Sequence, residues 1–204
     1  MKLTKILKYP LLLLLLGASI HTARAQNIKA ALLLGFNASQ VDGDDMAGYH
    51  KFGLNGGAMA ILPFKKKFSA SFEITYAQKG AKSFFNPEFP QEDFRYTMDY
   101  LEIPVLLNYH DKENIFFSAG GSVGILVRYR EVQQGLEVPV NEIPVNKRDY
   151  STVLSGTYLF AKHWGVNLRF SYSLFPIAYW PDISNRKNFK VSNNVITARL
   201  VYQF

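Results

Sequence analysis

The sequence contains no cysteine, and after residue 25 it has no long uninterrupted hydrophobic run. The absence of cysteine excludes disulfides, thiol catalysis and cysteine-ligated metals, so stability has to come from the fold itself. A membrane-spanning helix needs about 20 predominantly apolar residues. The chain after residue 25 therefore cannot be a helical membrane protein.

The N-terminal segment has the pattern of an export signal. Lys2, Lys5 and Lys8 precede an uncharged stretch from Tyr9 to Ile20 that contains six consecutive leucines. This stretch is too short to span a membrane as a helix, and it precedes the small-residue motif Ala23-Arg24-Ala25. We expect residues 1–25 to be a secretory signal peptide that signal peptidase removes, leaving residues 26–204 as the mature domain.

Most of the net positive charge of the chain comes from this signal. Its removal lowers the 23 basic residues to 19 against 16 acidic ones, so the formal net charge falls from +7 to +3. No Lys/Arg-rich recognition segment is present. The charge therefore does not predict nucleic-acid binding.

The apolar residues of the mature chain recur with a period of two. In residues 68–76, for example, Phe68, Phe72 and Ile74 alternate with Ser71 and Glu73. Such alternation is typical of strands with one apolar and one polar face. It predicts eight strands, over residues 28–39, 51–62, 68–76, 100–109, 115–130, 148–162, 166–174 and 196–204. Pro104 cannot donate to a sheet ladder and predicts a bulge, while Tyr129 is expected outside and Arg128 inside.

The links between these strands alternate between short and long. Short links occur at 63–67, 110–114 and 162–165, and longer ones at about 40–49, 84–95, 131–147 and 176–188. This pattern predicts an all-β fold, a closed antiparallel up-and-down transmembrane β-barrel of about eight strands. Short turns and both termini are expected in the periplasm, and long loops outside the cell.

A soluble barrel of the lipocalin type has the same period with the faces reversed. Periodicity alone does not choose between the two. Three features favour the membrane: the signal peptide, the terminal Phe204, and charged residues on the faces richest in Gly and Ser. Several tyrosines near strand ends, including Tyr96 and Tyr129, are expected to form interfacial girdles.

Three segments carry a resemblance to a known family. They are Gly48-Tyr49-His50-Lys51-Phe52-Gly53-Leu54, Tyr100-Leu101-Glu102-Ile103-Pro104-Val105 and Tyr172-Ser173-Leu174-Phe175-Pro176. The chain resembles the outer-membrane β-barrel domain of the PorT-like "porin family" of Bacteroidota over nearly its whole mature length. The resemblance implies an outer-membrane location, with no shared catalytic motif.

A candidate cluster of buried ions consists of charged residues that all fall on predicted inner faces, namely Glu73, Glu102, Arg169 and Arg199. Buried charges are tolerated when they are paired and hydrogen-bonded. Since an eight-stranded interior is just wide enough to be filled by side chains, we expect a structural plug. An ion or proton path is the alternative.

Other candidate sites are weaker. Asp42, Asp44 and Asp45 offer oxygen ligands for calcium, but an EF-hand loop starting at Asp42 would need a glutamate where Gly53 stands. His50, His110 and His163 accompany no Gly-x-Ser-x-Gly elbow. We therefore expect neither a metal site nor a cofactor nor an enzyme.

The C-terminal strand alternates Leu200, Tyr202 and Phe204 outward. This ending is typical of outer-membrane barrels and is expected to act as the signal read by the barrel-assembly machinery. The leading hypothesis for function is a structural, interaction or envelope-assembly barrel set among outer-membrane lipids, with an extracellular or envelope protein as partner. A narrow transport channel and a lipid-modifying enzyme are the alternatives.

Overall fold

The computed structural model describes residues 28–43, 48–83, 94–139, 145–181 and 188–204. The expected signal peptide and its cleavage site lie outside the described residues. Within the described ranges, no helix is long and apolar enough to cross a membrane. The strands are β1 (Lys29–Asp42), β2 (Lys51–Lys65), β3 (Phe68–Lys82), β4 (Phe94–Lys112), β5 (Ile115–Gln133), β6 (Leu136–Val138), β7 (Arg148–Leu159), β8 (Trp164–Ser173), β9 (Ala178–Pro181) and β10 (Asn188–Gln203).

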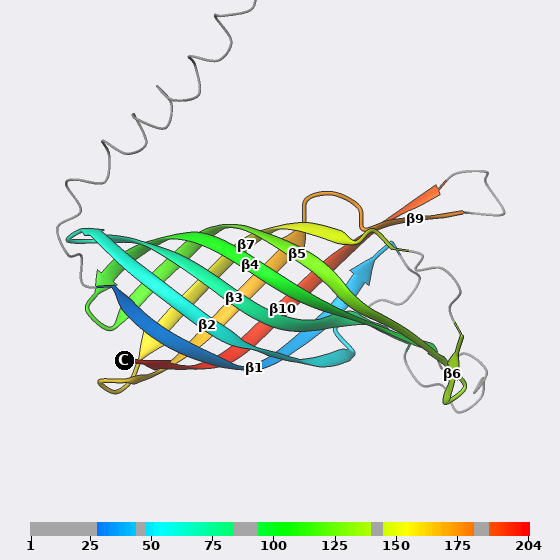
Figure 1. Cartoon of the computed structure of the whole chain (residues 1–204), viewed down its shortest axis with the longest axis horizontal. Coiled ribbons are helices and arrows are strands. Elements are labelled where there is room, and N and C mark those ends of the chain that lie inside the picture. Colours follow the sequence, from blue (N-terminus) through cyan, green and yellow to red (C-terminus); the bar gives the residue numbers. More distant parts are fainter. Residues whose placement is uncertain (1–27, 44–47, 84–93, 140–144, 182–187) are drawn as a thin grey trace, which may run out of the picture.

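Eight of these strands form a closed antiparallel barrel in the order β1-β2-β3-β4-β5-β7-β8-β10. β1 pairs with β10 from Ala31–Gln203 to Asp42–Ser192, and this pairing closes the ring. The predicted all-β, eight-stranded up-and-down barrel is therefore confirmed. Figure 1 shows the C-terminus at the end where the short turns lie, which we call the short-turn end.

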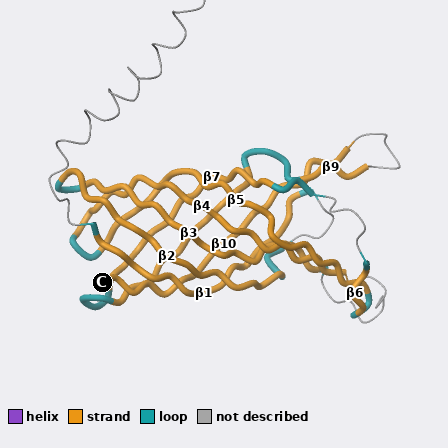
Figure 2. The backbone as a smooth tube through the Cα atoms, in the orientation of Figure 1, coloured by secondary structure: helices purple, strands orange, loops and turns teal. Residues whose placement is uncertain are grey.

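Two short strands lie at the opposite, long-loop end. β6 pairs with the end of β5, and β9 pairs with the start of β10. Figure 2 shows both hairpins extending beyond the barrel. Among the described residues, these two hairpins thus project from the long-loop end.

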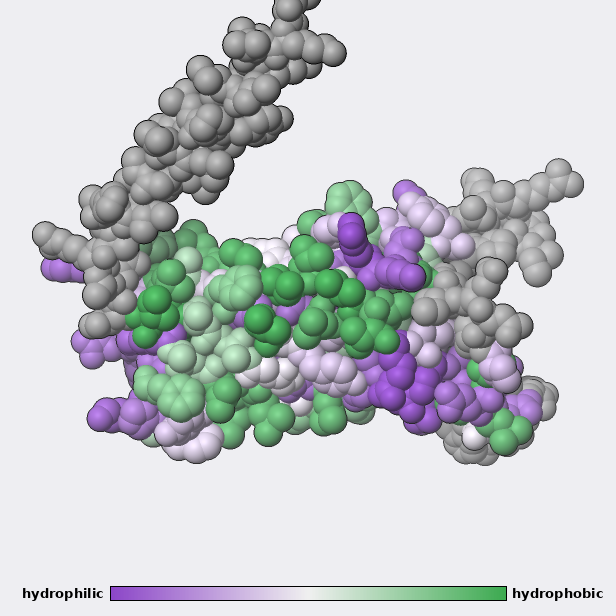
Figure 3. All heavy atoms as spheres, in the orientation of Figure 1, coloured by the Kyte–Doolittle hydropathy of each residue, from purple (hydrophilic) through white to green (hydrophobic). Residues whose placement is uncertain are grey.

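The two faces of each strand have opposite chemistry. On β1, Leu34 and Phe36 are 69% and 55% exposed, whereas Asn37 and Ser39 are buried. Figure 3 shows the resulting hydrophobic band around the visible side of the barrel. A soluble carrier would have this pattern reversed, so the lipocalin alternative is wrong.

The inner face also contains an apolar region that the period-two pattern did not predict. Ala31 and Leu33 are buried at the short-turn end of β1, on the inner face, where strict alternation predicts polar residues.

The register corrects two local predictions. Pro104 causes no bulge, because the β3–β4 register is the same on both sides of it and Pro104 lies opposite Ser122 on β5. The shift occurs instead where Asp99 pairs with Arg128 and the next residue, Tyr100, pairs with Leu126. One extra residue on β5 reverses its alternation. As a result, Tyr129 packs against the buried cluster and Arg128 is exposed.

Candidate functional site

The interior of the barrel contains two groups of buried ions. In the first, which we call the Glu73 cluster, the carboxylate of Glu73 on β3 binds arginines from two strands across the barrel. Arg169 Nη2 lies 2.5 Å from Glu73 Oε1, and Arg199 Nη1 lies 3.1 Å from Glu73 Oε2. Arg199 also donates from Nε and Nη2 to Asn167 Oδ1. One carboxylate thus fixes β8 and β10 against β3.

The second group, which we call the Lys79 cluster, has one cation between two anions, whereas the Glu73 cluster has one anion between two cations. Lys79 Nζ lies 2.6 Å from Glu102 Oε1 and 3.0 Å from Asp149 Oδ2. Asp149 also accepts hydrogen bonds from Ser173 and Asn193, at 2.7 and 2.8 Å. One cation on β3 therefore binds two carboxylates that come from β4 and β7, the two strands that flank β5.

All four residues proposed from the sequence lie on the inner face, but they do not form one cluster. Glu73, Arg169 and Arg199 are together, whereas the ion-pair partner of Glu102 is Lys79. Sequence reasoning missed Lys79 and Asp149. The alternation that places Glu73 and Thr75 inside would have found Lys79 had the predicted strand not ended at residue 76.

The two clusters balance each other in charge. The Glu73 cluster has two cations and one anion, and the Lys79 cluster has one cation and two anions. Together they form a neutral set of six buried ions. Buried ions of this kind are stable only when their partners and hydrogen bonds are present.

Apolar side chains lie beyond the ions at both ends of the lumen. At the short-turn end, the buried cluster consists of Ala31, Leu33, Met59, Ile61, Phe116 and Val201. At the long-loop end, it consists of Val41, Ala81, Tyr96, Met98, Tyr100, Val145, Ile177, Ala178 and Val191. Two of the latter come from links between strands, where Asn146 N donates to Ile177 O at 2.6 Å. The charged clusters are therefore enclosed between two apolar clusters.

Close packing continues between these groups. A Cβ added at Gly124 on β5 would lie 3.2 Å from the ring of Tyr100. Lys79 Nζ lies 5.1 Å from the centre of the same ring. The small inner residues of β5 thus leave room for a tyrosine that covers the Lys79 cluster.

A cavity of about 900 Å³ lies at the short-turn end. Its lining is basic and includes Lys29, Lys65, Lys66, Lys67, Lys112 and Lys162. None of the six buried ions contributes to this lining. Among the described residues, the cavity therefore gives no access to the ion clusters.

One serine–histidine contact has the distance of a nucleophile and its base. Ser69 Oγ lies 2.8 Å from His110 Nε2, and it also accepts a hydrogen bond from Asn108 Nδ2 at 3.0 Å. Ser69 is 0% exposed. A substrate carbonyl therefore has no path to its hydroxyl, and the contact belongs to the packed polar network of the lumen.

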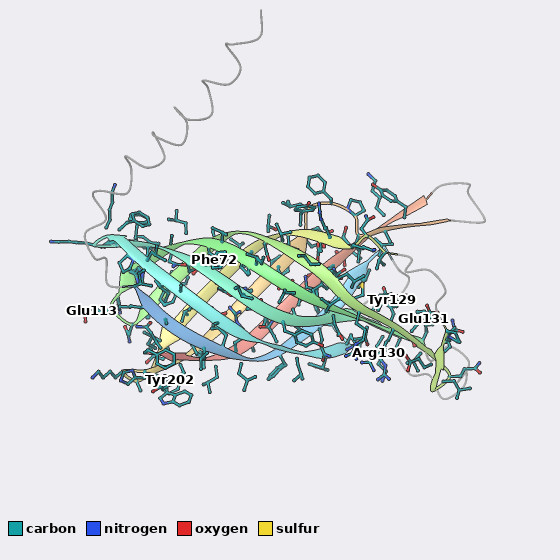
Figure 4. The ribbon with its side chains drawn as sticks, in the orientation of Figure 1. Phe72, Glu113, Tyr129, Arg130, Glu131 and Tyr202 are labelled. Atoms are coloured by element: carbon teal, nitrogen blue, oxygen red, sulfur yellow. The ribbon has the colours of Figure 1, made fainter. Side chains whose placement is uncertain are left out.

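Aromatic rings form a belt on the outside of the short-turn end. Tyr202 lies 4.8 Å from Trp164 and 5.2 Å from Phe204, measured between ring centroids. Figure 4 shows Tyr202 pointing away from the barrel. Leu200 and Phe204 are also exposed, so the outward alternation of the last strand is as expected. Tyr96 and Tyr129 are not part of a girdle, because they stack on each other in the buried cluster.

The acidic loop proposed for calcium is only partly described. Asp44 and Asp45 lie outside the described residues. Asp42 accepts hydrogen bonds from Gln40 and Asn194. Among the described residues, no group of three or more His, Cys, Asp and Glu side chains is arranged to hold a metal ion.

The fold agrees with known proteins. Ail, the attachment invasion locus protein of Yersinia pestis, is similar with 12% identity and a TM-score of 0.51, over 86% of this chain and 98% of that one. Neisserial surface protein A matches with 8% identity and a TM-score of 0.47, over 87% and 96% of the two chains. At these identities the likeness to Ail concerns the fold alone. No curated protein matches the chain.

The family model described as "Outer membrane protein beta-barrel domain" matches residues 24–179, most of the chain. The finer resemblance to PorT-like chains of Bacteroidota stays a prediction. The chain belongs to the outer membrane protein beta-barrel domain family, and it is an integral β-barrel of the outer membrane.

Proposed function

We propose that the protein is a non-conducting outer-membrane barrel that anchors its long-loop surface in the envelope and presents it to a protein partner. The observation that carries this proposal is the filled lumen, with six buried ions enclosed between two apolar clusters. In this role the barrel is a rigid platform, and it needs neither a catalytic group nor a cofactor.

We further propose that the short turns and both termini of the mature chain face the periplasm. The start of β1 and the end of β10 are paired at the short-turn end, as the Ala31–Gln203 pair shows. An even number of strands places both ends of the barrel on one side of the membrane. The hairpins of β5–β6 and β9–β10 then extend outside the cell.

A narrow channel is the main alternative, but the packing argues against it. Glu73 and Lys79 are each 1% exposed, although they carry charge and lie inside the barrel. A water-filled path beside them would expose these groups. Aqueous channels are typical of barrels with about 16 strands.

Planar-bilayer recording tests the proposal. The purified, folded full mature chain should give no stable conductance steps, while a trimeric porin purified in the same detergent and inserted in the same bilayer should give them. Steady ion-selective steps from the wild-type chain would make transport the leading function.

Deletion of Phe204 is expected to impair membrane insertion without affecting export. Phe204 N donates to Ala30 O at 2.9 Å, and its ring completes the aromatic belt. Because assembly of such barrels depends on the last strand, the deletion variant should accumulate in the periplasm and lose most of its outer-membrane signal in fractionation. A deletion of Gln26 at the other end provides the control. Normal outer-membrane levels of the Phe204 deletion would contradict the role assigned to Leu200, Tyr202 and Phe204.

A further inference from the structure

Cations are concentrated at one place near the long-loop end, on strands β2, β4 and β5. Arg95, Arg128 and Arg130 are exposed there, and Lys51 is buried close enough for Arg95, Asp99 and Arg130 to act on its charge. Figure 4 shows Arg130 on the extension of β5, and Figure 3 shows a strongly hydrophilic patch in the same region beside the hydrophobic band. We call Lys51, Arg95, Arg128 and Arg130 the basic rim.

Among the described residues, the basic rim has one ion pair. Asp99, which is 1% exposed, binds Arg128 Nε through Oδ2 at 2.8 Å, while the nearby Glu131 accepts from Tyr129 and Gln133. Lys51 is 7% exposed, yet its Nζ donates to the carbonyl oxygen of Phe52 at 2.7 Å. Among the described residues, no carboxylate lies within ion-pair distance of Lys51, Arg95 or Arg130.

This excess of positive charge favours an anion. A buried ammonium without a carboxylate is costly, and neighbouring guanidinium groups add repulsion. Arginine forks bind phosphate oxygens through paired, charge-assisted hydrogen bonds. Two exposed arginines without a carboxylate, Arg95 and Arg130, close to the buried Lys51 therefore have the composition of a phosphate site.

The surface next to the basic rim shows how such a phosphate would be presented. On β4 and β5, the Asp99–Arg128 pair is followed toward the membrane by the Leu101–Ile125 pair. Leu101, Ile125 and Val127 are 38%, 44% and 59% exposed. A ligand with an anionic head and acyl chains would contact both the basic rim and this apolar surface, whereas a free phosphate ion would contact only the basic rim.

We propose that the basic rim docks the phosphate group of a membrane lipid whose acyl chains lie along the apolar wall of β4 and β5. The assignment of this lipid to the outer leaflet rests on the orientation proposed above. The docking itself depends only on the rim and the wall. It adds a defined lipid contact to the barrel, next to the projecting β5–β6 hairpin.

The test uses the folded full mature chain in a maltoside detergent, with lipid A carrying two phosphates as the probe. Native mass spectrometry would measure retained lipid. The wild type should retain lipid A in preference to its dephosphorylated form. Arg95→Gln with Arg130→Gln should weaken retention by roughly tenfold or more, since two charge-assisted contacts are lost. Among the described residues, these two arginines bind no carboxylate, so their replacement leaves the Asp99–Arg128 pair intact.

Lys147→Gln with Lys190→Gln is the matched control, because it removes two exposed cations from the same end of the barrel. It should leave retention unchanged, and unboiled gel mobility should show that every variant is folded. Equal retention by the Arg95/Arg130 variant and the wild type would overturn the proposal. Equal loss in the control variant, equal retention of the dephosphorylated lipid, or displacement by inorganic phosphate at similar concentration would also overturn it. The conductance experiment is independent of all these outcomes.

Discussion

Glu73→Gln is expected to destabilise the folded barrel by about 3–5 kcal/mol, the usual cost of removing one partner from a buried ion pair. The substitution keeps the size of the side chain but leaves Arg169 and Arg199 facing each other without an anion. Urea unfolding in lipid vesicles would measure the loss. Glu137→Gln, on the exposed hairpin, removes the same charge outside the lumen and should change stability little.

The structure also predicts how much stability is lost when Arg169 is removed. Because Arg199 still binds Glu73 when Arg169 is removed, Arg169→Ala should cost less than Glu73→Gln. The double variant Glu73→Gln/Arg169→Ala should lose less stability than the sum of the two single losses, as expected for residues in direct contact. If the two single effects simply add, the Glu73 cluster does not couple these strands.

Lys79→Met is the second substitution with a large expected effect, again of about 3–5 kcal/mol. It leaves Glu102 and Asp149 as two carboxylates without their common cation. Loss of the fast-migrating unboiled gel band and a lower urea midpoint would show the destabilisation.

Rescue distinguishes this electrostatic cause from a simple loss of packing. Asp149 keeps donors from Ser151, Ser173 and Asn193, whereas the side chain of Glu102 has Lys79 as its ion-pair partner. Glu102→Gln should therefore restore much of the stability lost in Lys79→Met. A double variant that is no more stable than Lys79→Met would contradict the assigned roles.

The alternation of the sequence predicted the architecture because lipid and lumen impose opposite demands on neighbouring residues of a strand. It placed Glu73, Arg169 and Arg199 on one inner surface, but it did not determine which charges pair. Pairing depends on the stagger of strands that are far apart in sequence, which no local pattern records. For the same reason, the alternation placed Glu102 on the inner face without indicating that Lys79 is its ion-pair partner.

The errors in β4 and β5 have a different origin. The extra residue near Arg128 changes the face of every residue beyond it, so a strict period of two fails at Tyr129. Pro104 suggested the bulge at the wrong place, because the ladder there accepts a missing donor without inserting a residue. A bulge is determined by the paired strand as well as by its own sequence.

The distribution of the six buried ions along the chain has a consequence for assembly. Glu73, Lys79 and Glu102 come from β3 and β4 and sum to one negative charge, while Asp149, Arg169 and Arg199 come from β7, β8 and β10 and sum to one positive charge. Three of the four pairs join these halves, across as many as 126 residues in the case of Glu73 and Arg199. Before the barrel closes, its two halves would carry opposite net charges, and each half would contain charged side chains without their ion-pair partners. Their attraction favours a late, concerted closing step, in which the lumen is neutralised as the two halves come together.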